Sequence, residues 1–267
     1  MTRPSVRRRR RDRPREAAAA APAVLQPAPP VPRITWLSVL PEVLRLYGQD
    51  LSLYLAIGTV LQLPLAIALM VLPVPEVATV NLLAVPIGGA AIMYAAGQRQ
   101  AGREVGIVSA YVDTSPRLLK ILLFGLLVAV AGVVGQMIFG VVYAGVLFLV
   151  LAAYLGVRLF AVVPALLFEA DGIGAAVQRS WRLVAGRWRR AALPLAVLAI
   201  VEVAGISGLV LANWGAQAGG SALGLPESVL WVALLVPGLG VPLLIYPVSA
   251  LGVYLLYLDF VSPAGSP

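Results

Sequence analysis

Residues 175–212 read AAVQRSWRLVAGRWRRAALPLAVLAIVEVAGISGLVLA, and this stretch contains the pattern that decides the fold. An Arg-rich segment with two Trp residues comes first, and a long apolar run over 191–212 follows it. A helix of about 20 apolar residues is long enough to cross a bilayer. The stretch therefore predicts an amphipathic helix in the membrane interface that leads into a transmembrane helix.

The same kind of apolar run occurs six times along the chain. This repetition predicts an all-α polytopic membrane protein with six transmembrane helices. Pro237, Pro242 and Pro247 interrupt the last run, for which we expect a kinked helix preceded by a short outer helix; a broken helix that lines a site is the alternative. The predicted spans cover 51–72, 77–97, 119–139, 141–168, 191–212 and the part of 228–260 that ends near Asp259.

The charges predict how the chain is threaded. Hydrophobic residues make up 60% of the sequence and charged residues only 12%, with a net charge of +8. Every Lys and Arg except Arg158 can be placed on one side of a membrane. By the positive-inside rule, both termini and the basic loops face the cytoplasm of a multi-pass protein in the cytoplasmic membrane. We expect a disordered Arg/Ala/Pro-rich tail over 1–33, a six-helix domain over 34–261 and a short tail over 262–267.

Amphipathic helices precede the predicted hairpins. Residues 34–48 place apolar side chains at helical spacing, so we expect a helix that lies in the interface. The segments 106–127 and 172–195 both open with Gly-Ile and carry basic residues just before a span, which suggests a weak three-unit repeat. Small residues at Gly88, Gly89, Ala91 and Ala95, at Gly132 and Gly135, and at Ala204 and Gly208 predict close helix packing.

The residue inventory restricts the chemistry. The chain has no Cys and no His, which removes thiolate and imidazole groups as metal ligands and nucleophiles. Glu169 and Asp171 are close in sequence, but we expect them to be solvated at the exit of a span. We therefore predict a protein that is not an enzyme and that has no cofactor and no metal site.

Two sets of residues are candidates for function. The first is an interfacial set for anionic lipid headgroups or a protein partner, because Trp anchors at the interface and Arg pairs with phosphate. The alternative is that these cations only determine the topology and bind no specific ligand. Nucleic acid is a less favoured partner for these cations. In this set Val177, Trp181, Val184 and Trp188 are expected to form one apolar stripe. The interfacial contact residues are Arg179, Trp181, Arg182, Arg187, Trp188, Arg189 and Arg190.

The second set is a polar site inside the spans. Arg158, Glu202 and Gln62 are each predicted to lie near the midplane, about 15 Å deep. An isolated charge at that depth costs about 3 kcal/mol or more, so Arg158 and Glu202 are expected to pair with each other or with water. Such a site is either a buried ion pair that fixes helix packing or a path for an ion, a proton or a small solute.

The Arg179-Ser180-Trp181 segment, with Leu183, Val184, Gly186 and Trp188, resembles the membrane domain found with some glycerophosphodiester phosphodiesterases. It is also similar to related bacterial six-helix membrane proteins. The stretch from Arg158 to Gly172 and the closing Tyr257-Leu258-Asp259-Phe260 fit the same pattern, although the basic residue that usually follows is missing. The resemblance covers about residues 34 to 261 and implies a six-helix fold in a bacterial membrane. It does not imply hydrolysis, because that activity belongs to a separate catalytic barrel that this sequence lacks.

These observations favour a non-enzymatic scaffold or accessory subunit that contacts anionic lipids or a partner through a cytoplasmic Arg-rich face. The alternative is a small-solute or ion transporter that uses the midplane polar site.

Overall fold

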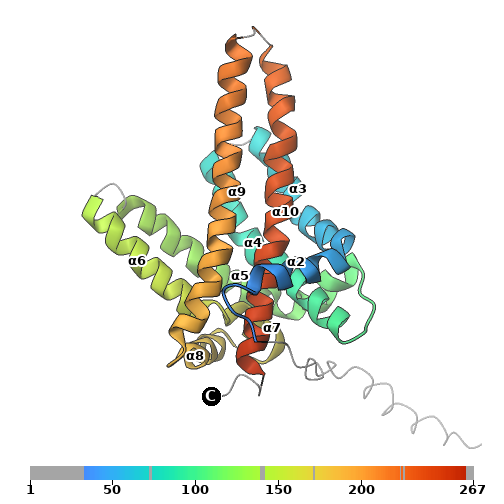
Figure 1. Ribbon diagram of the computed structural model, residues 1–267, viewed down its shortest axis with the longest axis vertical. Helices are drawn as coiled ribbons and strands as arrows, with labels where there is room; N and C mark the ends of the chain where they lie inside the picture. Colours follow the sequence, from blue (N-terminus) through green and yellow to red (C-terminus); the bar gives the residue numbers. More distant parts are fainter. Residues whose placement is uncertain are drawn as a thin grey trace, which may run out of the picture.

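The computed structural model describes residues 33–71, 74–138, 142–170, 172–222, 224 and 226–262, and every regular element in these ranges is a helix (Figure 1). The all-α prediction is therefore confirmed. Residues 1–32 and 263–267, which make up nearly all of the two predicted tails, lie outside the described residues. The helices are α2 (Val39–Gln49), α3 (Leu51–Val71), α4 (Val74–Gln100), α5 (Ile107–Ile138), α6 (Val142–Leu159), α7 (Val162–Phe168), α8 (Ile173–Val184), α9 (Trp188–Ala222) and α10 (Glu227–Val261).

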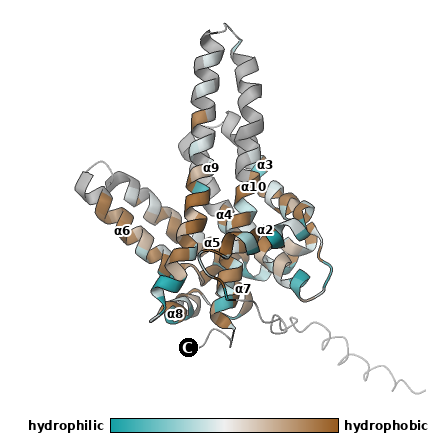
Figure 2. Ribbon diagram, in the orientation of Figure 1, coloured by the Kyte–Doolittle hydropathy of each residue, from teal (hydrophilic) through white to brown (hydrophobic). Residues whose placement is uncertain are grey.

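Three helical stretches are apolar and long enough to cross a membrane within the described part of the chain. They are Ile107–Gly132, Val146–Phe168 and Leu243–Val261. The first two bury little of their surface inside the protein, whereas the third is mostly buried. Brown, hydrophobic residues cover the middle of the molecule in Figure 2, and hydrophilic residues gather toward its lower end. An apolar outer surface of this kind is stable in lipid and not in water, so the chain is a membrane protein.

The core lies at the lower end of the molecule around the second half of α10. Leu251, Tyr254 and Leu256 on this helix are 0–2% exposed, and they form one cluster with Tyr54 of α3 and Leu166 of α7. Helices α2, α3, α4 and α9 all contact α10. The burial of this half of α10 explains why it carries aromatic side chains inside the bundle, where their large area contributes most to packing.

The short helix α7 is a feature that the sequence does not reveal. The predicted fourth span, 141–168, is not one straight helix: α6 ends at Leu159, and the chain turns at Phe160 and Ala161 before α7 begins. Val162, Ala165, Leu166 and other α7 residues are fully buried. Helix α6 alone is 18 residues long, or about 27 Å, which nearly matches the apolar core of a bilayer. The last turns of the apolar run are therefore free to fold into the protein.

Helices α9 and α10 form a long hairpin that extends beyond the other helices at the top of Figure 1. Each helix has 35 residues and is about 52 Å long. Helix α10 runs through Pro237, Pro242 and Pro247 without a break, so the separate outer helix that we expected does not form. The α5–α6 hairpin leans away from α9 and α10 in the same view.

The small-residue faces give three different outcomes. On α4, Ala91 and Ala95 are fully buried, and a Cβ atom at Gly88 would lie 2.7 Å from the Tyr246 hydroxyl, so this predicted face is confirmed. On α5, a Cβ at Gly135 would overlap the ring of Phe148, whereas one at Gly132 would meet no atom within 4 Å. On α9, Ala204 is exposed and a Cβ at Gly208 would meet no atom within 4 Å, so the predicted packing at these two residues does not occur among the described residues.

Candidate functional site

Helix α8 lies at the basic end of the molecule and has one buried side. Ala176, Ser180, Leu183 and Val184 are buried against the protein, whereas Trp181 is 41% exposed. The predicted stripe of Val177, Trp181, Val184 and Trp188 is therefore wrong in two respects. Trp181 does not share the buried side with Val184, and Trp188 does not belong to α8.

The reason that Trp188 is separated from α8 is a turn at residues 185–187. Gly186 has φ +74°, a left-handed conformation that ends helices and that glycine adopts without strain. Helix α9 then begins at Trp188, which is also 41% exposed. The two Trp side chains thus leave the protein from two helices rather than from one.

Arg179 is held by a carboxylate of the protein. Its Nε and Nη2 atoms donate to the Glu169 carboxylate at 2.7 Å and 3.3 Å, and the Tyr257 hydroxyl donates to the same carboxylate. The hydrogen bond from Arg179 to Glu169 raises the pKa of the guanidinium, although partial burial opposes this shift. Glu169 is therefore not merely solvated, as its sequence position suggested; it joins α8 to α10.

Arg190 is engaged in the same way. It pairs with Asp259, whose side chain is only 2% exposed, at 2.8 Å, and its guanidinium lies 5.4 Å from the centre of the Phe260 ring. The Arg187 guanidinium lies over the same ring at 5.9 Å. Two of the arginines predicted to contact lipid, Arg179 and Arg190, thus satisfy carboxylates within the chain.

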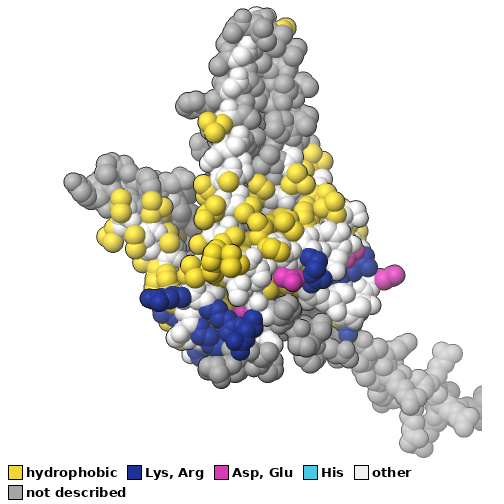
Figure 3. All heavy atoms as spheres, viewed as in Figure 1, with side chains coloured by type: hydrophobic (Ala, Val, Ile, Leu, Met, Phe, Trp, Pro, Cys, Tyr) yellow, Lys and Arg dark blue, Asp and Glu magenta, His cyan; other side chains and the backbone are white. Residues whose placement is uncertain are grey.

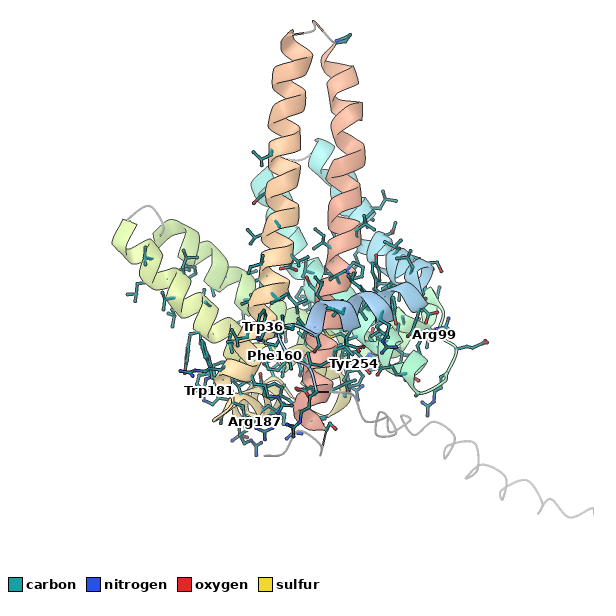
Figure 4. All side chains as sticks on the ribbon, viewed as in Figure 1. Trp36, Arg99, Phe160, Trp181, Arg187 and Tyr254 are labelled. Carbon is teal, nitrogen blue, oxygen red and sulfur yellow. The ribbon has the colours of Figure 1, made fainter. Side chains whose placement is uncertain are left out.

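Arg187 is half-buried over Phe260, and the four other interfacial residues form an exposed surface, which we call the basic face: Trp181, Arg182, Trp188 and Arg189. All four side chains are exposed. Figure 3 shows Lys and Arg side chains gathered at the lower end of the molecule, below a band of hydrophobic side chains. Figure 4 shows the labelled Trp181 and Arg187 both at this lower end. The arrangement matches a membrane interface, with cations at the headgroup level and Trp rings beside the acyl chains.

The three residues of the predicted midplane site lie on three different helices. Arg158 is in the last turn of α6, Glu202 is on α9 and Gln62 is on α3, and the latter two are half-buried. No contact joins Arg158 to Glu202 in the described part of the chain. The Arg158 guanidinium instead lies 4.8 Å from the centre of the Trp181 ring. Arg158 is therefore at the level of α8, because the chain turns inward right after it and does not continue as a straight span.

Sequence reasoning missed Ser180, a buried residue that fixes α8 to the end of α6. Its Oγ atom donates to the Arg158 carbonyl at 2.7 Å and accepts from the Ala161 amide at 3.2 Å. These are the backbone groups that the break between α6 and α7 leaves without helical partners. A Ser within an Arg-rich segment carries no signal of this role, because its partners lie 19 and 22 residues earlier.

Comparison with known proteins gives no match to this chain among family models, curated sequences or solved structures. The resemblance to the membrane domain of glycerophosphodiester phosphodiesterases thus stays an expectation from sequence.

Proposed function

We propose that this chain is a non-enzymatic, six-span protein of the cytoplasmic membrane, a scaffold or accessory subunit that contacts anionic lipid headgroups through its basic face. The basic face could alternatively bind a protein partner that has an acidic surface. In this proposal both termini face the cytoplasm, and no cofactor takes part.

The arrangement of the helices supports the six-span threading. Consecutive long helices pair as α3 with α4, α5 with α6, and α9 with α10, which gives three antiparallel hairpins. The amphipathic helices α2 and α8 lead directly into the first and third hairpins. Arg103 lies in the connection after α4, and Arg99, Arg182 and Arg189 lie in helical turns beside the open ends of these hairpins, as the positive-inside rule requires for a cytoplasmic surface.

The observation that carries the lipid-contact function is the exposure of Arg182 and Arg189 beside exposed Trp181 and Trp188. These cations are not held by carboxylates within the described part of the chain, in contrast to Arg179 and Arg190. Each basic residue at an anionic surface contributes about 1 kcal/mol. Two exposed arginines together thus favour an anionic over a neutral lipid by about tenfold or more.

The test is the lipid selectivity of the purified protein in mixed bilayers. The fraction of spin-labelled phosphatidylglycerol in contact with the protein is compared with that of spin-labelled phosphatidylcholine. The comparison is made for the wild-type chain and for an Arg182→Gln/Arg189→Gln double variant. We expect the wild type to prefer phosphatidylglycerol and the double variant to lose most of that preference. Arg45→Gln is the matched control, because Arg45 already pairs with Glu42 at 2.8 Å.

Two outcomes would contradict the proposal. One is a wild type that shows no preference between the two lipids. The other is a double variant that keeps the full preference of the wild type. Ion or proton flux through the same vesicles, above the level of protein-free vesicles and abolished by Glu202→Gln, would favour the transporter hypothesis instead.

A further inference from the structure

Arg158 is the centre of an aromatic arrangement where the end of α6 meets α8. Its guanidinium lies 4.8 Å from the Trp181 ring centre and 5.4 Å from the Tyr154 ring centre, and its Nε donates to the Tyr154 hydroxyl at 3.2 Å. The two rings meet edge to face at 6.4 Å. We call these three residues the Arg158 seat. Stacking on two rings restricts the guanidinium to a narrow range of positions before any ligand binds.

Arg158 differs from four other arginines in having no carboxylate partner among the described residues. Arg45, Arg99, Arg179 and Arg190 each have a carboxylate within 3.5 Å, whereas no carboxylate of the described residues pairs with Arg158. The Nε–H donates to Tyr154, and among the described residues the two terminal nitrogens have no hydrogen-bond acceptor, so their N–H groups can bind another one. A planar guanidinium with both terminal nitrogens available matches the oxygens of a phosphate in a two-point hydrogen-bonded contact.

The protein surface next to the Arg158 seat is apolar. Along α6, the residues on the same helical side as Arg158 are exposed and apolar: Leu147 is 71% exposed, Leu151 51% and Leu155 37%. Trp181 and Tyr154 remain 41% and 38% exposed, so the seat is accessible from outside the protein. A ligand that fills both parts must carry an oxyanion, such as a phosphate, and a long apolar chain.

We propose that the Arg158 seat binds one anionic phospholipid, with its phosphate on the Arg158 guanidinium and an acyl chain along α6. This inference rests on the proposed function, because it names one specific lipid position next to the more diffuse basic face. The fixed end of α6 makes the position specific: Ser180 anchors the Arg158 carbonyl to α8, the helix that also supplies Trp181. The positive field of the basic face favours an anionic over a zwitterionic headgroup.

Native mass spectrometry of the full-length protein tests the proposal. The chain in a mild detergent is titrated with phosphatidylglycerol, and the affinity of the first bound lipid is compared among variants. A charge-assisted two-point contact is among the strongest hydrogen-bonded contacts that a protein makes. We therefore expect Arg158→Gln to weaken the first lipid at least tenfold, and Arg158→Lys, which keeps the charge and loses the planar fork, to weaken it less. Arg45→Gln, the matched control, should bind the first lipid as the wild type does.

A second variant tests the proposal if Arg158→Gln fails to fold. Trp181→Leu keeps the Arg158 charge and removes one ring of the seat, and we expect a few-fold weaker first lipid with an unchanged melting temperature. Excess inorganic phosphate should not displace the lipid, because phosphate has no acyl chain to contact the apolar side of α6. Displacement by free phosphate would show that the ligand is phosphate alone and would overturn the proposal.

The results separate this inference from the proposed function. In one outcome, Arg158→Gln binds lipid as well as Arg45→Gln does while the Arg182→Gln/Arg189→Gln variant loses binding. In that case the proposed lipid site at the Arg158 seat is wrong, and the proposed lipid contact of the basic face is supported. If none of these variants changes lipid binding, both are wrong.

Discussion

The guanidinium of Arg190 and the carboxylate of Asp259 join the start of α9 to the end of α10, 69 residues later. Nε of Arg190 donates to Asp259 at 3.1 Å, and Nη2 donates to both carboxylate oxygens at 2.8 Å. Asp259 is 2% exposed while the Arg190 side chain is 27% exposed, so the acid lies inside the protein and the base covers it. This pair closes the base of the longest hairpin.

Asp259→Asn should therefore lower the free energy of unfolding by about 2 kcal/mol, because it removes the buried carboxylate charge to which the Arg190 guanidinium donates its hydrogen bonds. The free energy of unfolding is measured by SDS titration in mixed micelles. Glu42→Gln is the matched control, since it breaks an exposed Arg–carboxylate pair at the same 2.8 Å distance and should cost less than about 0.5 kcal/mol. Equal losses in the two variants would contradict the role given to Asp259.

Ser180→Ala should lower the free energy of unfolding, again measured by SDS titration in mixed micelles, by about 2 kcal/mol. The change removes the hydroxyl that bonds both the Ala161 amide and the Arg158 carbonyl at the break between α6 and α7, so a buried amide and a partly buried carbonyl each lose this hydrogen bond. Ser109→Ala is the comparison, because the Ser109 hydroxyl also bonds an amide and a carbonyl, those of Gly106, but at an exposed helix start where water replaces it. A Ser109→Ala loss as large as that of Ser180→Ala would refute this account.

Gly135→Ala should destabilise the α5–α6 hairpin by about 1–3 kcal/mol, since the new methyl group would lie 1.9 Å from a Phe148 ring carbon. Gly132→Ala, three residues earlier on the same helix, meets no atom within 4 Å and should be neutral or slightly stabilising. Adding Phe148→Leu to Gly135→Ala should restore most of the loss. Failure of this double variant to recover stability would argue against the contact.

The threading can be tested with single cysteines, because the chain has none of its own. Pro226→Cys lies just before α10 and Ala101→Cys just after α4, both at exposed positions. In intact cells a membrane-impermeant maleimide should label the Pro226→Cys variant, and it should label the Ala101→Cys variant only after permeabilisation. The reverse pattern would invert the proposed orientation, and labelling of both variants from outside would refute the paired hairpins. Both variants must react equally in detergent.

Local patterns were sufficient to predict the helices and the basic end of the molecule. Apolar runs of about 20 residues and the amphipathic periodicity of α2 and α8 are properties of neighbouring residues, so they are visible without a structure. The start of the first helix shifted because of a local turn that helical periodicity does not reveal. Helix α2 begins at Val39 rather than at 34, after Thr35 and Ser38 bond each other's amides in a tight turn.

The amino-acid sequence by itself determined the membrane environment of this protein, its helical class and the concentration of cations at one end, because bilayer insertion depends on the summed apolarity and charge of contiguous segments. The tertiary structure alone decided which cations are available. Arg179 and Arg190 find carboxylates on distant segments, and Arg158 finds two aromatic rings instead of Glu202. Spacing along the chain cannot reveal these partners, because the inward turn after α6 sets the depth of Arg158 and depends on buried bonds between residues 19 and 22 positions apart.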